Sequence, residues 1–143
     1  MELVQYIYTS TCSAAMTAQN AYDMSSKSVS LCEQFGITGR VFANRQQALA
    51  MTEGPKEIVE RYYQSVCRDP YVFATLLHVN RIIPAREFND YSVWLNLGTQ
   101  FEFSDSVRPL TADTVHLALP DNPSPRLRIM AEAYLDDDML IAV

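Results

Sequence analysis

Residues 35–54 read Phe-Gly-Ile-Thr-Gly-Arg-Val-Phe-Ala-Asn-Arg-Gln-Gln-Ala-Leu-Ala-Met-Thr-Glu-Gly, and this stretch decides the fold. Gly36 and Gly39 lie where an amphipathic segment gives way to β-branched and aromatic residues. Glycine adopts positive φ angles without steric cost, so this spacing is typical of a helix C-cap followed by a turn into a strand. We therefore predict that a helix ends here and a strand begins.

Two short apolar runs follow these glycines, at residues 40–43 and 48–54, and the polar residues 44–46 separate them. Such a pattern predicts a β-hairpin. Gly54 and Pro55 then end the second strand, and proline is favoured in the first turn of a helix. The stretch thus predicts helix, hairpin and helix in succession.

The flanking sequence extends this pattern in both directions. Residues 3–9 are β-branched and aromatic and predict a buried first strand. Further elements are expected as a helix over 17–34, a helix over 55–68, a strand over 72–83 and a strand over 91–97. The order βαββαββ predicts an α+β, ferredoxin-like sandwich, with both helices on one side and the first strand flanked by two others.

The pattern changes after residue 98, so we divide the chain into a domain of residues 1–98 and a C-terminal helical extension of residues 99–143. Residues 109–119 and 126–135 are expected to form short helices. The chain ends in an apolar run, 139–143. We expect this end to pack on the exposed sheet face, with a docking segment or subunit contact as the alternative.

Composition excludes several classes of protein. The net charge is −6 and Lys and Arg are not clustered, which argues against nucleic-acid binding. No segment approaches the roughly 20 apolar residues that span a bilayer, and the N-terminus does not resemble a signal peptide. Cys12, Cys32 and Cys67 match neither a disulfide framework nor a metal clip, so we expect reduced thiols in a cytoplasmic protein.

Four collinear motifs resemble the BLUF family, blue-light sensors that bind a flavin between two helices. They are Tyr6-Ile7-Tyr8-Thr9-Ser10, Gly36-Ile37-Thr38-Gly39, Glu53-Gly54, and the segment from Arg86-Glu87-Phe88 to Tyr91-Ser92-Val93-Trp94. The resemblance covers about residues 1–98. It implies the fold reached above, with output through the C-terminal helices and the sheet surface.

The positions that the resemblance assigns to the flavin are largely changed. An asparagine pair at the end of the first helix corresponds to Leu31 and Cys32, and the glutamine that hydrogen-bonds both flavin and tyrosine corresponds to Ala50. An arginine near the cofactor phosphates corresponds to Ser65. Of the photochemical set, only Tyr8 and Trp94 remain.

Each unmade hydrogen bond to a buried polar edge costs about 1–3 kcal/mol. We therefore expect no cofactor, with FAD as the alternative, and a groove filled by side chains or open as an apolar pocket. Gln46 or Gln47 could replace the missing glutamine only after a slip in strand register.

The favoured hypothesis is a BLUF-like regulator that has lost flavin photochemistry and acts through protein–protein interaction or homo-oligomer assembly. The alternative is a flavin- or small-ligand-binding sensor with an altered pocket. We expect no enzyme and no catalytic residue, because the loop 10–15 lacks the arginine and glycine of an acylphosphatase-like anion loop. We also expect no metal site, since the cysteine spacings match no metal clip. His78 is interpreted as structural, and His116 has no evident partner in the sequence.

Overall fold

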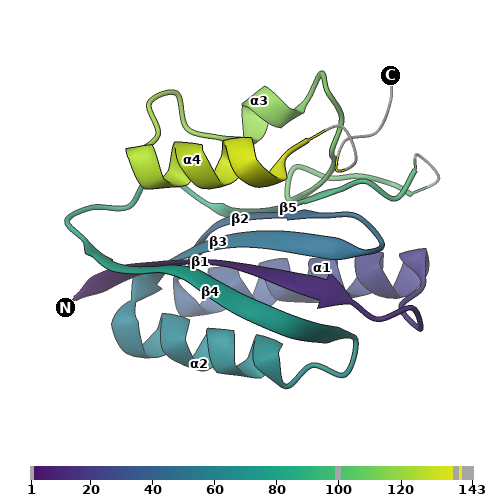
Figure 1. Cartoon of the computed structure of the whole chain (residues 1–143), viewed down its shortest axis with the longest axis horizontal. Coiled ribbons are helices and arrows are strands. Elements are labelled where there is room, and N and C mark those ends of the chain that lie inside the picture. The colour runs from purple at the N-terminus through teal and green to yellow at the C-terminus, as the bar shows by residue number, and fades with distance from the viewer. Residues whose placement is uncertain (1, 99–100, 137–138, 140–143) are drawn as a thin grey trace.

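The computed structural model describes residues 2–98, 101–136 and 139, and these form an α+β fold built on one sheet (Figure 1). Within that part of the chain the sheet has six strands in the order β4-β1-β3-β2-β5-β6. The strands are β1 (Leu3–Cys12), β2 (Thr38–Ala43), β3 (Gln47–Pro55), β4 (Val72–Ile83), β5 (Tyr91–Leu95) and β6 (Val107–Pro109). The helices are α1 (Ala18–Phe35), α2 (Lys56–Cys67), α3 (Val115–Ala118) and α4 (Pro125–Tyr134).

The predicted turn from helix to hairpin is confirmed. Gly36 caps α1 in the left-handed region, with φ of 73°. Gly39 begins the close approach of β2 to β3, because a Cβ atom there would lie 1.9 Å from the carbonyl oxygen of Met51. The Asn44 side chain closes the hairpin by accepting hydrogen bonds from the backbone amides of Gln46 and Gln47, both at 2.8 Å.

Helix α1 has local support that its serine-rich sequence does not reveal. Thr17 and Asn20 form a reciprocal capping box at its start. The hydroxyls of Ser25 and Ser26 donate to the carbonyls of Ala21 and Tyr22, one turn earlier. These bonds satisfy the serine hydroxyls within the helix, and its inner face packs on the sheet through buried residues such as Cys32.

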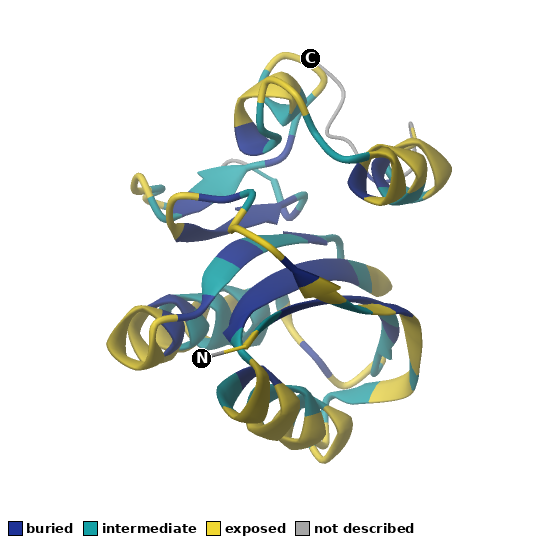
Figure 2. Ribbon diagram, turned by 90° about the vertical axis from the view of Figure 1, so that its left-hand side faces the viewer, coloured by how far each residue is buried: buried dark blue, intermediate teal, exposed yellow. Residues whose placement is uncertain are grey.

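Strand β1 lies between β3 and β4, as predicted, and pairs antiparallel with both. Its alternating side chains therefore enter two different cores. Tyr6 and Tyr8 face α1 and α2, whereas Ile7 faces the layer that contains α3 and α4. Figure 1 shows these two helical layers on opposite sides of the sheet, and Figure 2 shows the buried strands between them.

The prediction of a helix over residues 109–119 is wrong for most of that range. Residues 107–109 instead form β6, an edge strand that pairs parallel with β5. The chain then turns, with the Thr114 hydroxyl donating to the Pro109 carbonyl at 2.7 Å, and only residues 115–118 are helical. The sheet edge offered by β5 provided backbone partners that local helix propensity did not anticipate.

Helix α4 matches the second predicted helix of the extension and packs on the sheet face opposite α1 and α2. Leu127 and Ala131 are its buried residues, and Met130 and Tyr134 pack against the same core. Met139 is also buried there, and its carbonyl accepts from the Asn96 amide at 3.0 Å. The rest of the predicted apolar end, residues 140–143, lies outside the described residues.

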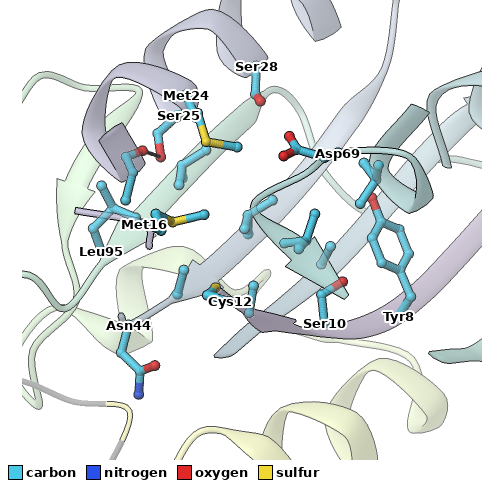
Figure 3. Close-up of a pocket in the computed structure, with 18 of the residues that line it drawn as sticks. Tyr8, Ser10, Cys12, Met16, Met24, Ser25, Ser28, Asn44, Asp69 and Leu95 are labelled. Carbon is cyan, nitrogen blue, oxygen red and sulfur yellow. Dashed lines mark hydrogen bonds between the residues drawn. The ribbon is translucent and has the colours of Figure 1, made fainter. Parts of the chain in front are cut away.

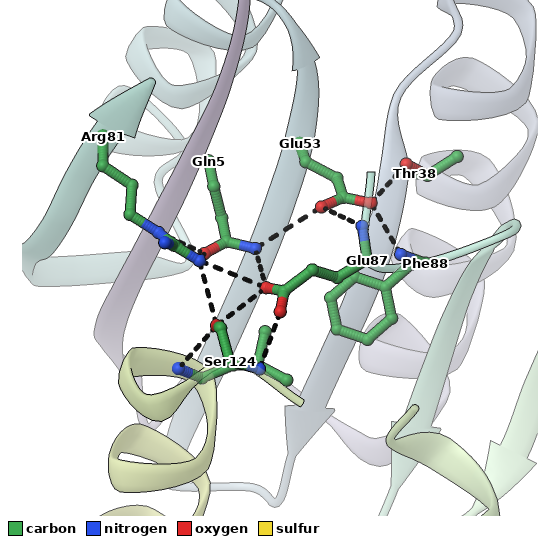
Figure 4. Close-up of polar contacts among 8 residues, drawn as sticks. Gln5, Thr38, Glu53, Arg81, Glu87, Phe88 and Ser124 are labelled. Atoms are coloured by element: carbon green, nitrogen blue, oxygen red, sulfur yellow. Dashed lines mark hydrogen bonds and ion pairs between the residues drawn. The ribbon is translucent and has the colours of Figure 1, made fainter. Parts of the chain in front are cut away.

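A buried carboxylate joins β3 to the loop before β5 (Figure 4). Glu53 is fully buried, and its Oε1 accepts from the Thr38 hydroxyl at 2.9 Å and from the Phe88 amide at 2.8 Å. Its Oε2 accepts from the Glu87 amide at 3.1 Å and from the Gln5 side chain at 3.4 Å. Four donors thus replace the water that this carboxylate loses on burial.

A second carboxylate, that of Glu87, continues this network to α4 (Figure 4). It accepts from the Gln5 side chain at 2.7 Å and pairs with Arg81 at 3.3 Å. It also accepts from both the backbone amide and the hydroxyl of Ser124, the N-cap residue of α4, at 2.8 and 3.0 Å. Burial raises the pKa of Glu87, but the bonds from Gln5 and Ser124 and the Arg81 charge outweigh it and hold this pKa below its usual value.

We predict that Glu87→Gln destabilises the fold at neutral pH by about 1–3 kcal/mol, because an ionised acceptor is replaced by a neutral amide. The lowered pKa means that the contribution is present above the ordinary glutamate pKa, near 4.3, and is lost as pH falls through the folded-state pKa. Denaturant unfolding at neutral and strongly acidic pH measures this, and the two proteins should converge in acid. Glu132→Gln, on the exposed face of α4, is the control. A constant difference between Glu87→Gln and the wild type at both pH values would contradict the prediction.

Candidate functional site

A cavity of about 140 Å³ lies between α1, α2 and the sheet (Figure 3). A cavity of this order admits one aromatic ring. Its walls are largely apolar and come from β1, α1, the hairpin and β5. The lining includes Tyr8, Met16, Met24, Ser25, Ser28, Val41, Ala50, Tyr62, Tyr91 and Val93. Of the two alternatives for the groove, the structure therefore supports an apolar pocket and not a groove filled by side chains.

Tyr8 and Ala50 line this inner cavity as direct cross-strand partners in the pairing of β1 with β3. Both side chains face the helices, and both are buried. The observed register excludes the slip that would bring Gln46 or Gln47 opposite Tyr8. Gln47 pairs with Thr11, next to the turn, and Gln46 lies in the turn itself. No glutamine therefore lies opposite Tyr8, and Ala50 has no side-chain group to hydrogen-bond it.

Cys32 is fully buried in the same core cluster as Tyr8 and Tyr91, and Tyr62 packs against this cluster. Burial raises the pKa of its thiol to about 11, and hydrogen bonds with Tyr62 and Tyr91 offset part of that rise. The hydroxyls of Tyr62 and Tyr91 are 3.3 Å apart. Burial likewise raises the pKa of Tyr62 to about 12 and those of Tyr8 and Tyr91 well above the usual tyrosine value. The Cys32 thiol and the three tyrosine hydroxyls are therefore protonated at neutral pH.

Sequence reasoning missed the contribution of Tyr62 and Tyr91 to this cluster. The sequence pattern predicts only that Tyr62 lies in the helix over 55–68 and that Tyr91 begins the strand over 91–97. The usable signal was the requirement that a buried tyrosine hydroxyl find a polar partner. Since Tyr91 begins a strand next to the hairpin, its hydroxyl and that of Tyr62 meet over the sheet.

The other positions singled out in the sequence lie elsewhere. Leu31 and Ser65 line a second, outer cavity between α1 and α2, and Leu31 is 43% exposed. Trp94 is buried on the opposite face of the sheet, in the core shared with α4. Its indole nitrogen donates to Ser92 at 2.9 Å, and the Arg108 guanidinium lies 4.7 Å from its ring centroid. The structure thus brings Tyr8, Cys32 and Ala50 together and separates Trp94 from them.

Comparison with known proteins gives the family. The model of the BLUF family, described as sensors of blue-light using FAD, matches residues 3–94. The chain belongs to the BLUF family. No curated protein matches it. Among solved structures, the chain is similar to the BlrP1 BLUF domain, with 17% identity over 96% of this chain and 93% of that chain and a TM-score of 0.71. It is also similar to BlrB, a BLUF protein in its dark state, with 21% identity, coverages of 96% and 89%, and a TM-score of 0.63.

A longer neighbour bears on the cofactor. The chain covers 35% of Klebsiella pneumoniae BlrP1 with FMN and cyclic diGMP, and 95% of this chain is aligned at 16% identity with a TM-score of 0.71. The expectation of no cofactor is therefore corrected, because the BLUF family is one of flavin sensors, and FAD is the cofactor that its description names.

The cavity fits one part of a flavin better than another. Its apolar walls suit the flat face of an aromatic ring. The polar side chains among the lining residues are those of Ser10, Ser25, Ser28, Asn44, Asp69 and three tyrosines, Tyr8, Tyr62 and Tyr91. Among the described residues, no buried side-chain nitrogen or oxygen lacks a hydrogen-bond partner. A polar ring edge would therefore compete with bonds already formed, which weakens its binding without closing the cavity.

Among the described residues, no helix is long and apolar enough to cross a membrane. No group of three or more His, Cys, Asp or Glu side chains in that part of the chain is placed to hold a metal ion. His78 contacts the Thr9 hydroxyl at 2.7 Å and the Tyr134 ring, so it belongs to the packing of α4 on the sheet.

We predict that the three cysteines differ in reactivity with iodoacetamide at mildly alkaline pH. All three are free, but only Cys67 is exposed, whereas Cys32 is fully buried with a pKa raised to about 11. Burial also raises the pKa of Cys12. Peptide mass spectrometry should show Cys67 modified first and Cys32 modified only after denaturation. Modification of Cys32 at the rate of Cys67 in the folded protein would contradict this assignment.

Proposed function

We propose that this protein is a BLUF-family regulator that has lost the light-driven hydrogen-bond switch and signals through contact with another protein or a second copy of itself. The observation that carries the first part is the pairing of Ala50 with Tyr8. A methyl group neither donates nor accepts a hydrogen bond, so no rearrangement at this position can follow absorption of light. The chain is assigned no reaction of its own, and its free cysteines support a cytoplasmic setting.

The inner cavity favours a second possibility within the same proposal. A flavin or similar flat ring would enter an apolar space without the amides that hold it, so its affinity should be reduced about tenfold or more for each lost bond. Such a protein would respond to whether its cavity is filled rather than to light. Occupancy and illumination can be tested separately.

The test of the lost switch is Ala50→Gln. A glutamine here places an amide opposite Tyr8, so we expect FMN to bind about tenfold tighter and blue light to shift the flavin absorbance. The wild type should bind FMN weakly, and light should leave its spectrum unchanged. Flavin fluorescence quenching and difference absorbance spectra measure the two properties.

Ala48→Gln is the matched control, because Ala48 lines the same cavity on the same strand but pairs with Ser10 instead of Tyr8. It should gain no light response. A light-induced spectral shift in the wild-type protein would overturn the lost switch. If Ala50→Gln folds and binds FMN but shows no light-induced spectral shift, the absence of glutamine at position 50 is not the sole cause of the lost light response.

Contact with another protein is supported by strand β4, which forms one edge of the sheet. Edge strands present unpaired backbone groups, and β4 also carries large apolar side chains that are exposed. These are Phe73, Leu76, Leu77 and Ile82. A longer similar structure also supports contact with another protein part. It is titled a bacterial light-regulated adenylyl cyclase, and this chain covers 33% of it, at 13% identity and a TM-score of 0.63.

We predict that Leu76→Lys weakens self-association, because Leu76 is 60% exposed on this edge and a charge there opposes pairing. Light scattering after size exclusion, over a range of protein concentrations, measures the mass. Ile129→Lys is the control, since Ile129 is similarly exposed, at 59%, but lies on α4. A wild type that stays monomeric at all concentrations would exclude the homo-oligomer and leave a different protein as the partner.

A further inference from the structure

Three sulfur-bearing side chains line the inner cavity, those of Cys12, Met16 and Met24. In Figure 3 their sulfur atoms border the cavity, and Tyr8 and Asp69 lie on its other side. Met16 is only 7% exposed, and Cys12 and Met24 are partly buried. Thiolates and thioethers are soft ligands, which select soft metal ions such as Cu(I).

The local structure fixes where each of these side chains begins. Cys12 ends β1, and its backbone amide donates to the Gln46 carbonyl at 2.8 Å. The Met16 amide donates to the Ser13 carbonyl at 3.0 Å, so this turn keeps Met16 close to the end of β1. Met24 lies on the face of α1 that borders the cavity. The ligands thus come from a strand end, a closed turn and a helix face around one space.

The two methionines can adapt their sulfur positions to a bound ion. A methionine side chain is unbranched and flexible, and so its thioether can rotate into adjacent open space. The cavity of about 140 Å³ supplies that space. Rotation of both side chains can therefore bring their sulfur atoms onto an ion held by the Cys12 sulfur while the backbone stays in place.

The charge of the sulfur ligands favours a monovalent ion. Thioethers are neutral, and a metal-bound cysteine is a thiolate with a single negative charge. A Cu(I) ion makes this group neutral, whereas a zinc ion would leave a net positive charge between largely apolar walls. The Asp69 carboxylate also lines the cavity, but it already accepts from the Tyr71 amide at 2.8 Å.

We propose that Cys12, Met16 and Met24 form a three-coordinate site for a soft monovalent metal ion, Cu(I). The ion replaces the proton of the Cys12 thiol, which passes to solvent, and no oxidation state changes. The cysteine spacings alone gave no reason to expect this site, because they take no account of thioether ligands. The inference is independent of the proposed function, since it holds whether or not a flavin binds.

The test uses the Cys67→Ser protein as the parent, because the exposed Cys67 thiol would itself bind soft metal ions. Cys67 lines neither of the two cavities described above. Competition with the Cu(I) chelator bicinchoninate, followed by its absorbance, gives stoichiometry and affinity. We expect one Cu(I) per chain. Binding should weaken about tenfold or more in Met24→Leu and in Cys12→Ser, since even the loss of an outer-shell partner costs about 10- to 100-fold.

Met130→Leu in the same parent is the matched control, because Met130 packs in the core on the opposite face of the sheet. Leucine and methionine have similar volumes, so both leucine variants should fold, which circular dichroism checks. Met130→Leu should bind Cu(I) as the parent does, and X-ray absorption should show sulfur alone around the ion. Failure of the parent to take Cu(I) from the chelator, unchanged affinity in folded Met24→Leu, or displacement of the ion by excess zinc would overturn the site.

Discussion

The antiparallel pairing of β1 with β3 is the constraint on which the rest of this structure depends. Because successive side chains of a strand face opposite ways, one register fixes both surfaces of the sheet at once. It places Tyr8 opposite Ala50 on the side of α1 and α2, and Gln5 opposite Glu53 on the side of α4. A shift of β3 by one residue would turn Ala50 towards α4 and the Glu53 carboxylate towards α1 and α2. The cavity and the polar network are thus two results of a single alignment.

Much of the fold could be predicted because its signals are local. The glycines at 36 and 39 and the Gly54-Pro55 boundary before α2 act within a few residues, and both lie where the sequence pattern predicts them. Strand β6 could not be predicted in this way, because it depends on the edge of β5, distant in the sequence. The face of the sheet on which Trp94 lies could not be predicted either. It depends on which alternate residues of β5 point towards α4, and not on the chemistry of the tryptophan side chain.

The site was less predictable than the fold, for a related reason. Residue identity showed that amides are missing at Cys32 and Ala50, but it did not show what occupies the space beside them. In the structure, hydroxyls of Tyr62 and Tyr91 contact the Cys32 thiol and leave a cavity next to it. The structure therefore combines the absence of side-chain amides at Cys32 and Ala50 with an open space between the helices and the sheet. A prediction of no cofactor confused these two properties, and the family assignment corrects it.

The Glu87 carboxylate couples the docking of α4 on the sheet to the capping of that helix. The same group binds the sheet through Gln5 and Arg81 and caps the helix through Ser124. Separation must expose that carboxylate to water and uncap the first turn of α4 in the same event. Undocking of α4 and unwinding of its first turn are therefore coupled, because both break bonds to the same carboxylate.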